Sequence, residues 1–445
     1  MRELKGEQPI AFEKLKEFVD IGTGMHLLQG YAGTGKTFLM GEIVQYCKMK
    51  SVSILATAPT HKAVKVLKDK TQISTDFATI HSALGMKEFI DDDGNLSFRS
   101  DPLLGYPAEK YDLILIDEAS MIPDVIFDDL AKLAGKGKKV LFVGDPLQIP
   151  PVNHDYAMPF LRKVQEEYNI GVATMKEIIR QAVGNPIIEN AHDIRTRIEE
   201  RVPILKRQPV QTDVGEVIHV PMGFQDLFQN QVLPMYKTAT YLRDIDYVKV
   251  IGWRNDTVNM YNYMIREHIF GEGLPKIVVG DRLIADAPII ENSIIHVSTN
   301  EEMIVEGVTE EEEDLGGDYI LRYYKTRIKV IGRTGVFNEY MIRIIHENSE
   351  AAYDKICQLQ IKLAKTYPKG SYQSKSAWMD YYKFIEHWHK VKYSYCITAH
   401  KSQGSTYDTA YVLQWDIMAN QDVFERNRIL YTACTRPSRN LYIEY

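Results

Sequence analysis

Residues 25–37, MHLLQGYAGTGKT, decide the fold class of this chain. The run MHLLQG is short and apolar, as expected for a buried strand, and a helical pattern follows it. Between the two, Gly30 to Thr37 match the pattern GxxxxGK followed by Ser or Thr, a turn whose backbone N–H groups cradle phosphate oxygens at a helix N-terminus. Lys36 should reach the β- and γ-phosphates of a nucleotide, and Thr37 should hold Mg²⁺. The cradle itself should include Gly33, Thr34 and Gly35.

The flanking strand and helix favour this site over a glycine-rich turn without a ligand. Three further apolar runs, at 51–59, 111–118 and 138–145, alternate with helical stretches. That alternation predicts a parallel sheet with crossover helices. Between the second and third of the four strands, a DDDGN turn flanked by phenylalanines predicts a small β-hairpin at about 84–108.

The rest of the chain predicts a second α/β domain with an insertion. Strand and helix patterns return in 179–273 and again in 393–445. Residues 274–392 differ, because short β-rich pieces are followed by a helical stretch rich in lysine and aromatic residues. We therefore expect domain 1 at 1–178, domain 2 in two parts, and an inserted domain at 274–392. The acidic run Glu310 to Asp314 is interpreted as a solvated loop.

Composition excludes several classes of protein. The 445 residues are 45% hydrophobic and 25% charged, as in ordinary globular proteins, so a small secreted module or a disordered chain is excluded. The first residues are charged and no long apolar run occurs, so we expect neither secretion nor membrane spanning. The four cysteines are too widely spaced for a zinc site and suggest free thiols. A net charge of −7 lowers the expectation of a nucleic-acid partner without excluding a locally positive groove.

A carboxylate pair, Asp117 and Glu118, ends the apolar strand LILI. After a phosphate loop in the same sheet, Asp117 is expected to bind Mg²⁺ and Glu118 to orient and deprotonate the attacking water. An exposed strand end without function is the alternative. Together the two motifs predict an enzyme that hydrolyses a nucleoside triphosphate.

A series of segments in order along the chain resembles the superfamily 1 helicases, most closely the RecD/Dda-like group. They are Gln8 ahead of the phosphate loop, APTHKA (58–63), ATIHS (78–82), VGDPLQIPPV (143–152), Arg180 in EIIRQ, ITAHKSQGST (397–406) and LYTACTR (430–436). The last two carry most weight because each is long and they follow in the family's order.

The resemblance implies two RecA-like P-loop domains, with the hairpin inserted in the first and an SH3-like domain with a helical extension in the second. It implies an ATP- and Mg²⁺-dependent helicase that moves on single-stranded DNA from 5′ to 3′ and opens duplexes with a hairpin pin. Single-strand/duplex junctions would be its substrates, with replication or recombination proteins as partners. We expect a monomer without a membrane partner, acting in the cytoplasm of a bacterial or phage-infected cell.

Roles for individual residues also follow from the resemblance. Gln8 would read the adenine, Gln148 would sense the γ-phosphate, and Gln403 and Gly404 would lie near the nucleotide. Arg180 and Arg436 lie outside the first domain, so they could reach a γ-phosphate only across an interdomain cleft. An arginine supplied in this way is worth ~10³–10⁵ in rate, so domain closure would gate hydrolysis.

The DNA track should run over loops at the ends of the strands. Its candidates are Pro59, Thr60, His61, His81, Thr398, His400, Lys401 and Ser402. Phe98 in the hairpin falls where the group carries its wedge. Trp378 resembles residues near the strand, although core packing is an equal alternative for it. Each histidine taken alone also suits a packed or solvent-facing position.

Two other functions remain open. A translocase or protein-stripping motor would show DNA-stimulated ATPase activity without strand displacement. A nucleic-acid-independent NTPase would show no stimulation, and its ATPase would be insensitive to salt. The segments at 397–406 and 430–436 argue against the second.

Overall fold

The structure is a computed structural model that describes residues 3–71, 75–101, 105–151, 154–177, 184–200, 202, 209–221, 227–291, 294–316, 319–330 and 338–445. In these ranges no helix combines the length and apolar character needed to cross a membrane. The chain forms two compact units. The first comprises Met1–Gly85, Ser100–Tyr261 and Cys396–Tyr445, and the second comprises Met86–Arg99 and Asn262–Tyr395.

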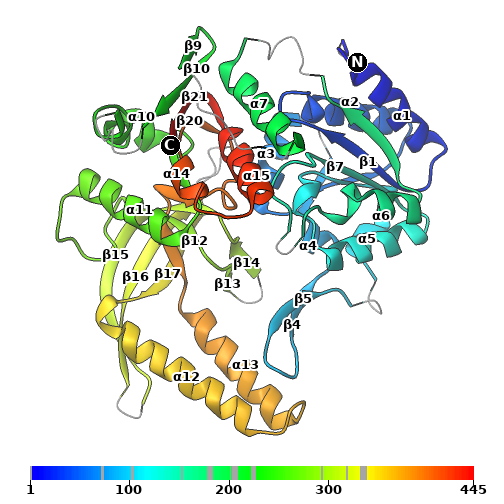
Figure 1. Ribbon diagram of the computed structural model, residues 1–445. Helices are drawn as coiled ribbons and strands as arrows, with labels where there is room; N and C mark the ends of the chain where they lie inside the picture. The colour runs from blue at the N-terminus through cyan, green and yellow to red at the C-terminus, as the bar shows by residue number, and fades with distance from the viewer. Residues whose placement is uncertain are drawn as a thin grey trace. The chain divides into compact units, whose positions relative to one another are not determined.

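A six-stranded parallel sheet carries the phosphate-loop motif in the first unit (Figure 1). Its strands, in spatial order, are β3 (Asp76–Thr79), β2 (Ile54–Ala58), β6 (Leu113–Ile116), β7 (Lys139–Gly144), β1 (Gly24–Gly30) and β8 (Gly171–Met175). Its helices are α1 (Gln8–Asp20), α2 (Lys36–Met49), α3 (His61–Thr71), α4 (Ile80–Ala83), α5 (Asp124–Gly135) and α6 (Arg162–Glu167), with 3-10 turns at Pro107–Lys110, Ala119–Met121 and Met158–Phe160. The four predicted strands are confirmed. Their apolar runs are continuous because both faces of such a sheet are covered.

A second six-stranded sheet lies in the same unit. Its order is β19 (Cys396–Thr398), β11 (Val248–Gly252), β20 (Tyr407–Leu413), β21 (Pro437–Glu444), β10 (Gly215–Val220) and β9 (Val210–Thr212). Neighbouring strands are parallel except β9, which pairs antiparallel with β10. Its helices are α7 (Pro186–Glu200), a π-turn at Phe228–Val232, α9 (Leu233–Met235), α10 (Ala239–Arg243), α11 (Asn255–Phe270), α14 (Gln414–Ile417) and α15 (Val423–Cys434). The predicted return of α/β structure is confirmed.

Asp416, which follows β20, is hydrogen-bonded to the start of α11. Its carboxylate is fully buried and accepts hydrogen bonds from the backbone N–H groups of Trp253 (2.6 Å) and Arg254 (2.9 Å), where α11 begins. It also accepts from the Arg254 Nε (2.6 Å) and from the Thr257 hydroxyl (2.7 Å). One carboxylate beyond the end of β20 therefore accepts hydrogen bonds from the backbone N–H groups that precede α11.

We expect Asp416→Ala to lower the free energy of unfolding by about 3–5 kcal/mol, because buried donors would lose their charged partner. Urea denaturation followed by circular dichroism measures this. The matched control is Asp256→Ala, an exposed carboxylate in the first turn of α11, which should cost no more than about 1 kcal/mol. Equal losses in the two variants would contradict the role assigned to Asp416.

The second unit is built on an antiparallel sheet. Its order is β17 (Asn338–Ile345), β16 (Ile320–Val330), β15 (Glu302–Asp314), β12 (Arg282–Ala285) and β18 (Val391–Tyr393), with a separate ribbon of β13 (Ile289–Glu291) and β14 (Ile294–Val297). Two antiparallel helices, α12 (Glu350–Thr366) and α13 (Tyr372–His387), form an arm that projects from this sheet (Figure 1). The predicted β-rich block followed by helices is confirmed.

The interpretation of Glu310 to Asp314 as a loop was wrong, because these residues form the end of β15 and pair with β16. Cations on β16 and β17 pair with them: Glu311 with Lys325 of β16 (3.0 Å), Glu312 with Arg322 of β16 (2.6 Å) and Glu313 with Arg343 of β17 (2.7 Å). Opposite charges on adjacent strands stabilise a sheet, so an acidic run can form a strand here.

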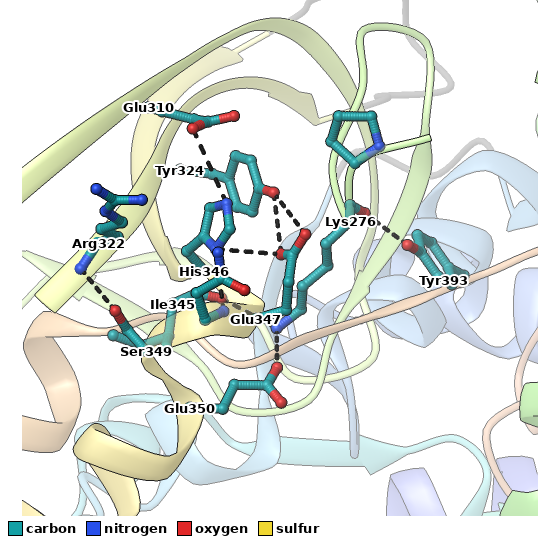
Figure 2. Close-up of polar contacts among 12 residues, drawn as sticks. Lys276, Glu310, Arg322, Tyr324, Ile345, His346, Glu347, Ser349, Glu350 and Tyr393 are labelled. Atoms are coloured by element: carbon teal, nitrogen blue, oxygen red, sulfur yellow. Dashed lines mark hydrogen bonds and ion pairs between the residues drawn. The ribbon is translucent and has the colours of Figure 1, made fainter. Parts of the chain in front are cut away.

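Where α12 begins, polar contacts join it to the sheet (Figure 2). The ring of His346 stacks on Tyr324, whose hydroxyl donates to the Glu347 carboxylate (2.9 Å). Lys276 binds the Glu350 carboxylate (2.5 Å) and the Ile345 carbonyl (3.0 Å). The arm is therefore held at its base by the strands that precede it.

The predicted hairpin is confirmed as β4 (Lys87–Ile90) and β5 (Leu96–Arg99), which close over a turn at 91–95. The hairpin packs on the arm. The Tyr382 hydroxyl donates to the Gly94 carbonyl (2.7 Å), and Lys369 forms an ion pair with Asp93. Gly94 has a φ of +83°, and a β-carbon there would overlap the indole of Trp378. The tip of the hairpin therefore requires glycine both for its backbone and for this close approach.

Candidate nucleotide site and nucleic-acid interface

The phosphate-loop motif lies between β1 and α2, as the sequence predicts. Gly33 and Gly35 have φ near +80°, a conformation that favours glycine. Lys36 donates to the carbonyls of Gly30 (2.6 Å) and Tyr31 (3.0 Å), so its ammonium lies across the loop. Thr34 is buried, and its hydroxyl donates to the Tyr31 carbonyl (2.9 Å). Thr37 follows in the first turn of α2.

Gln8 lies beside the same loop. Its side chain is 2% exposed, and its amide donates to the Gly35 carbonyl (3.5 Å) while its carbonyl accepts from the Lys5 N–H (3.0 Å). The residue expected to read the base is thus next to the loop expected to hold the phosphates. The structure brings these two predictions together.

Asp117 and Glu118 directly follow β6, in the sheet that holds the phosphate loop. The Asp117 carboxylate accepts from the Glu118 N–H (2.9 Å). Glu118 has a φ of +53° and a ψ of 42°, a left-handed conformation that is uncommon outside glycine. Holding it costs roughly 1–3 kcal/mol, and such strain is concentrated at functional positions. Oxygen donors on Asp117 and Thr37 suit a hard cation such as Mg²⁺.

Residues of the segment at 143–152 contact α15 from the other sheet. Asp145 is fully buried and accepts from the Tyr431 hydroxyl (2.7 Å), which in turn accepts from the Ala32 N–H of the phosphate loop (3.2 Å). The Thr432 hydroxyl accepts from the Ile149 N–H (3.2 Å). The phosphate loop, the end of β7 and α15 are therefore linked through one tyrosine.

Gln148 is 7% exposed, and its Oε1 has no hydrogen-bond partner in the part of the chain that the structure describes. An unsatisfied buried carbonyl costs ~1–3 kcal/mol, which is typical of a group kept for function. Gln403 is also buried, and its amide donates to the Ile149 carbonyl (2.9 Å). Gly404 has a φ of +70° and packs on Ala63, where a β-carbon would lie 3.1 Å from the Ala63 side chain.

The two predicted arginines have different outcomes. Arg436 is 6% exposed, and its guanidinium donates to Thr432, Ser405 and Thr435, all within its own part of the second sheet. In this arrangement it does not extend to the phosphate loop, so its expected role requires a movement. Arg180 lies outside the described residues.

Candidates for the DNA track lie in loops and helix starts at the ends of strands. Pro59 and Thr60 follow β2, the Thr60 hydroxyl accepts from the Ala63 N–H (3.1 Å), and His61 opens α3 with an exposed side chain. Thr398 ends β19, and its hydroxyl accepts from the Lys401 N–H (3.3 Å). These two sets approach each other where Gly404 packs on Ala63.

Ser402 is fully buried and its hydroxyl donates to the Ala399 carbonyl (2.7 Å), so the side chain supports the turn instead of lining a surface. Burial lowers the pKa of His400 and of His81, and for His81 the neighbouring His61 adds to the effect. Both imidazoles are therefore neutral at neutral pH. They can exchange hydrogen bonds with a strand but add no positive charge to its track.

Phe98 lies on β5 and is 39% exposed; Phe89 on β4 is 46% exposed, and the register of the hairpin places the two side chains on opposite faces. Trp378 is 6% exposed against the hairpin turn, so of the two alternatives left open for it, core packing is the one that the structure shows. Cys47, Cys396 and Cys434 are buried free thiols, and Cys357 is a half-buried free thiol.

Three features of the site were not predicted from the sequence. They are the left-handed backbone of Glu118, the bridging role of Tyr431, and Arg428. The last is a fully buried side chain that donates to the carbonyls of Gln148, Pro146 and Asp155. Tyr431 lies within a quoted motif, but nothing in its spacing indicates a contact with a residue 399 positions away.

Comparisons with known proteins identify two family matches and several similar chains. Residues 3–208 match the AAA domain family and residues 393–443 match the UvrD-like helicase C-terminal domain. The chain is 25% identical to the ATP-dependent DNA helicase dda of Enterobacteria phage T4, over 92% of each chain. It is 24% identical to an uncharacterized protein of Acanthamoeba polyphaga mimivirus, over 98% of each. A Pif1 helicase from Bacteroides, solved in complex with ADP-AlF3 and ssDNA, is 14% identical with a TM-score of 0.48, covering 99% of this chain and 92% of that one.

The phosphate loop, the carboxylate pair and the two mainly parallel sheets, with matches to an AAA domain and to a UvrD-like helicase C-terminal domain, indicate the class: the chain is similar to the superfamily 1 helicases, and its two sheets are RecA-like. Within the superfamily its similarity is to the RecD/Dda-like group, and it is an ATP-hydrolysing DNA helicase.

Proposed function

We propose that the chain, as a monomer, uses Mg²⁺ and ATP to move 5′→3′ along single-stranded DNA and to separate a duplex at its hairpin. The observation that carries this proposal is the junction inside the first unit. There Tyr431 links the phosphate loop to Asp145, and Gln403 links the loop before β20 to the loop after β7. Both halves of an ATP-driven motor are thus supplied by one chain. The polarity rests on the relationship to the RecD/Dda-like group.

In this proposal each residue acts on bound nucleotide or strand. Thr37 and Asp117 would hold Mg²⁺, which neutralises charge on the β- and γ-phosphates. Lys36 would move from the Gly30 carbonyl to those phosphates, and Glu118 would orient the attacking water. Gln148 would sense the γ-phosphate, and Arg436, with Arg180, would complete the site when the two sheets close. Gln8 would contact the adenine, with Gln403 and Gly404 nearby.

For the DNA, the proposed track contains Pro59, Thr60, His61 and His81 from the first sheet and Thr398, His400 and Lys401 from the second. Short hydroxyls and helix starts suit phosphate contacts without sequence preference. The domain boundaries proposed from the sequence, including an SH3-like inserted domain, remain part of this proposal.

The hairpin supports strand separation because it is held by the arm. Opening one base-pair step costs roughly 1.4 kcal/mol, and a wedge can apply this only if it does not bend away. The contacts of Gly94 with Tyr382 and Trp378 and the pairs of Lys369 with Asp93 and Lys375 with Asp92 restrain its tip. Phe98, exposed on β5, is the proposed wedge.

The experiment that tests the function is strand displacement with ATP and Mg²⁺ on matched duplexes carrying a 5′ tail, a 3′ tail or no tail. We expect displacement of the 5′-tailed duplex alone. Opening of only the 3′-tailed duplex would contradict the polarity. DNA-stimulated ATPase without displacement would indicate a translocase, and ATPase without stimulation would indicate a nucleic-acid-independent enzyme.

We expect Gly94→Ala to lower the rate of strand displacement by about an order of magnitude while ATPase activity on single-stranded DNA stays within about twofold, because only the wedge loses its support. The matched control is Gly137→Ala. Gly137 has the same φ of +83°, but a β-carbon there meets no described residue within 4 Å. Backbone strain is then common to both variants, and the clash with Trp378 is specific to one. Equal displacement rates in the two variants would argue against a restrained hairpin.

A further inference from the structure

Arg428 lies in α15, in the second sheet's part of the first unit, yet its guanidinium is directed at the loop after β7. Its Nε and Nη2 donate to the Gln148 carbonyl at 3.1 and 2.6 Å, and Nη2 also donates to the Pro146 carbonyl at 2.8 Å. Nη1 donates to the Asp155 carbonyl. The side chain, 2% exposed, thus holds three backbone carbonyls on both sides of Gln148, 280 positions away in the chain.

Two aromatic rings complete the contacts of this guanidinium. The rings of Tyr156 and Phe424 lie 4.8 and 5.3 Å from its central carbon, at cation–π distance. Burial lowers the pKa of Arg428 to about 10, so the group stays charged at neutral pH. A buried charge that is bonded only to neutral carbonyls is energetically costly. The planar guanidinium offers several N–H donors in fixed directions, so it can bind several carbonyl oxygens at once. A lysine could not reproduce this arrangement.

The contact between Arg428 and the Gln148 backbone affects the position of the Gln148 side chain. Its backbone carbonyl is bonded twice to Arg428, while its side-chain Oε1 is buried without a partner among the described residues. The position of the side chain is therefore determined by the backbone that Arg428 holds. Beside it, Arg428 also lines an open cavity of about 300 Å³ together with His400, His154 and Glu425.

We propose that Arg428 is a positioning residue, which sets from α15 the place where the Gln148 side chain meets the γ-phosphate. The inference rests on the proposed role of Gln148 and deepens it. Because α15 belongs with the second sheet, a displacement of that sheet would be passed to the γ-phosphate sensor through the guanidinium. His400, a proposed DNA contact, lines the same cavity as Arg428.

The test is a double-mutant cycle of Arg428→Ala and Gln148→Ala in the full chain, measured as ATPase activity with saturating single-stranded DNA. Since a displacement of about 1 Å can cost ~10²-fold in rate, we expect Arg428→Ala to lower kcat by about 10–100-fold with the KM for ATP within about threefold. In the Gln148→Ala background the same change should add less than about threefold, because the residue through which it acts is already absent.

Arg426→Ala is the matched control, since Arg426 lies on the same helix and its Nε has no hydrogen-bond partner among the residues that the structure describes. It should keep kcat within about twofold. Millimolar guanidinium, which can enter through the cavity, should restore part of the activity of Arg428→Ala, and the same concentration of sodium should not. Arg428→Lys keeps the positive charge but lacks the planar set of guanidinium donors. It should show the same coupling to Gln148→Ala, with a smaller loss of kcat than Arg428→Ala.

An unchanged kcat in Arg428→Ala would overturn the inference. So would a double variant whose loss of kcat equals the product of the losses in Arg428→Ala and Gln148→Ala. The proposed function would fail in a different way, through absence of DNA-stimulated ATPase in the unaltered chain. Thermal melting of each variant accompanies the kinetics, and a loss of kcat that follows only the loss of melting temperature, without coupling to Gln148, also counts against the proposal.

Discussion

Replacing Lys36 with alanine should lower the rate of ATP hydrolysis by at least about 10²–10³-fold, the range measured when one preorganised donor to a developing charge is removed. The ammonium now lies on the Gly30 and Tyr31 carbonyls at the start of α2. Its loss would remove both a cation and a donor from the helix end that faces the phosphates. The measurement is steady-state ATPase activity with and without single-stranded DNA.

Lys48→Ala is the control for this change, because Lys48 is an exposed cation in the last turn of the same helix. It should leave both activities within about twofold of the unaltered chain. Binding of single-stranded DNA without nucleotide should be retained in Lys36→Ala, which separates a loss of chemistry from a loss of folding. Unchanged hydrolysis in Lys36→Ala would remove the phosphate loop from the mechanism.

The second large effect is expected from Glu118→Gln, which should lower kcat by about 10²–10⁴-fold, the usual contribution of a general base. Glutamine keeps the size of the side chain and the left-handed backbone at φ +53°, so the change is confined to the proton acceptor. Affinity for ATP should stay within about threefold of the unaltered chain, unlike that of Lys36→Ala. Single-turnover hydrolysis and binding of a fluorescent nucleotide measure the two quantities.

Glu109→Gln is a suitable comparison, because Glu109 lies in the 3-10 turn before β6 and its carboxylate binds Lys136 on the surface. It should hydrolyse ATP at nearly the normal rate. If Glu118→Gln also did so, the base would have to be sought elsewhere in the site, and the strained backbone at Glu118 would need another explanation.

Most of the fold could be predicted because its signals are local. Continuous apolar runs such as LILI mark buried parallel strands, and the DDDGN turn marks the hairpin. The acidic end of β15 could not be predicted in this way. Its strand conformation depends on Lys325, Arg322 and Arg343, which lie on other strands. A run of acidic residues does not by itself indicate which cations on other strands will pair with it.

In the candidate site, too, features encoded in one short segment could be predicted, and contacts between distant segments could not. Gly33, Gly35 and Lys36 are recognisable because one short segment contains the whole phosphate loop. Arg428 and Tyr431 are different, because their contacts join segments far apart in the sequence and a helical pattern does not reveal which buried side chain crosses to another element. Trp378 illustrates the converse, since an aromatic residue in a basic stretch suits stacking on DNA equally well until its packing on Gly94 is seen.

The hydrogen bond between the Tyr431 hydroxyl and the Ala32 N–H has a consequence for the order of events in the cycle. Backbone N–H groups of a phosphate loop are donors that a bound triphosphate uses, so nucleotide and tyrosine compete for one donor. The exchange replaces one hydrogen bond with another and therefore costs little, while it releases α15 from the loop. In the proposed cycle, arrival of ATP would thus remove one of the contacts that join α15 to the first sheet, before Arg436 approaches the γ-phosphate.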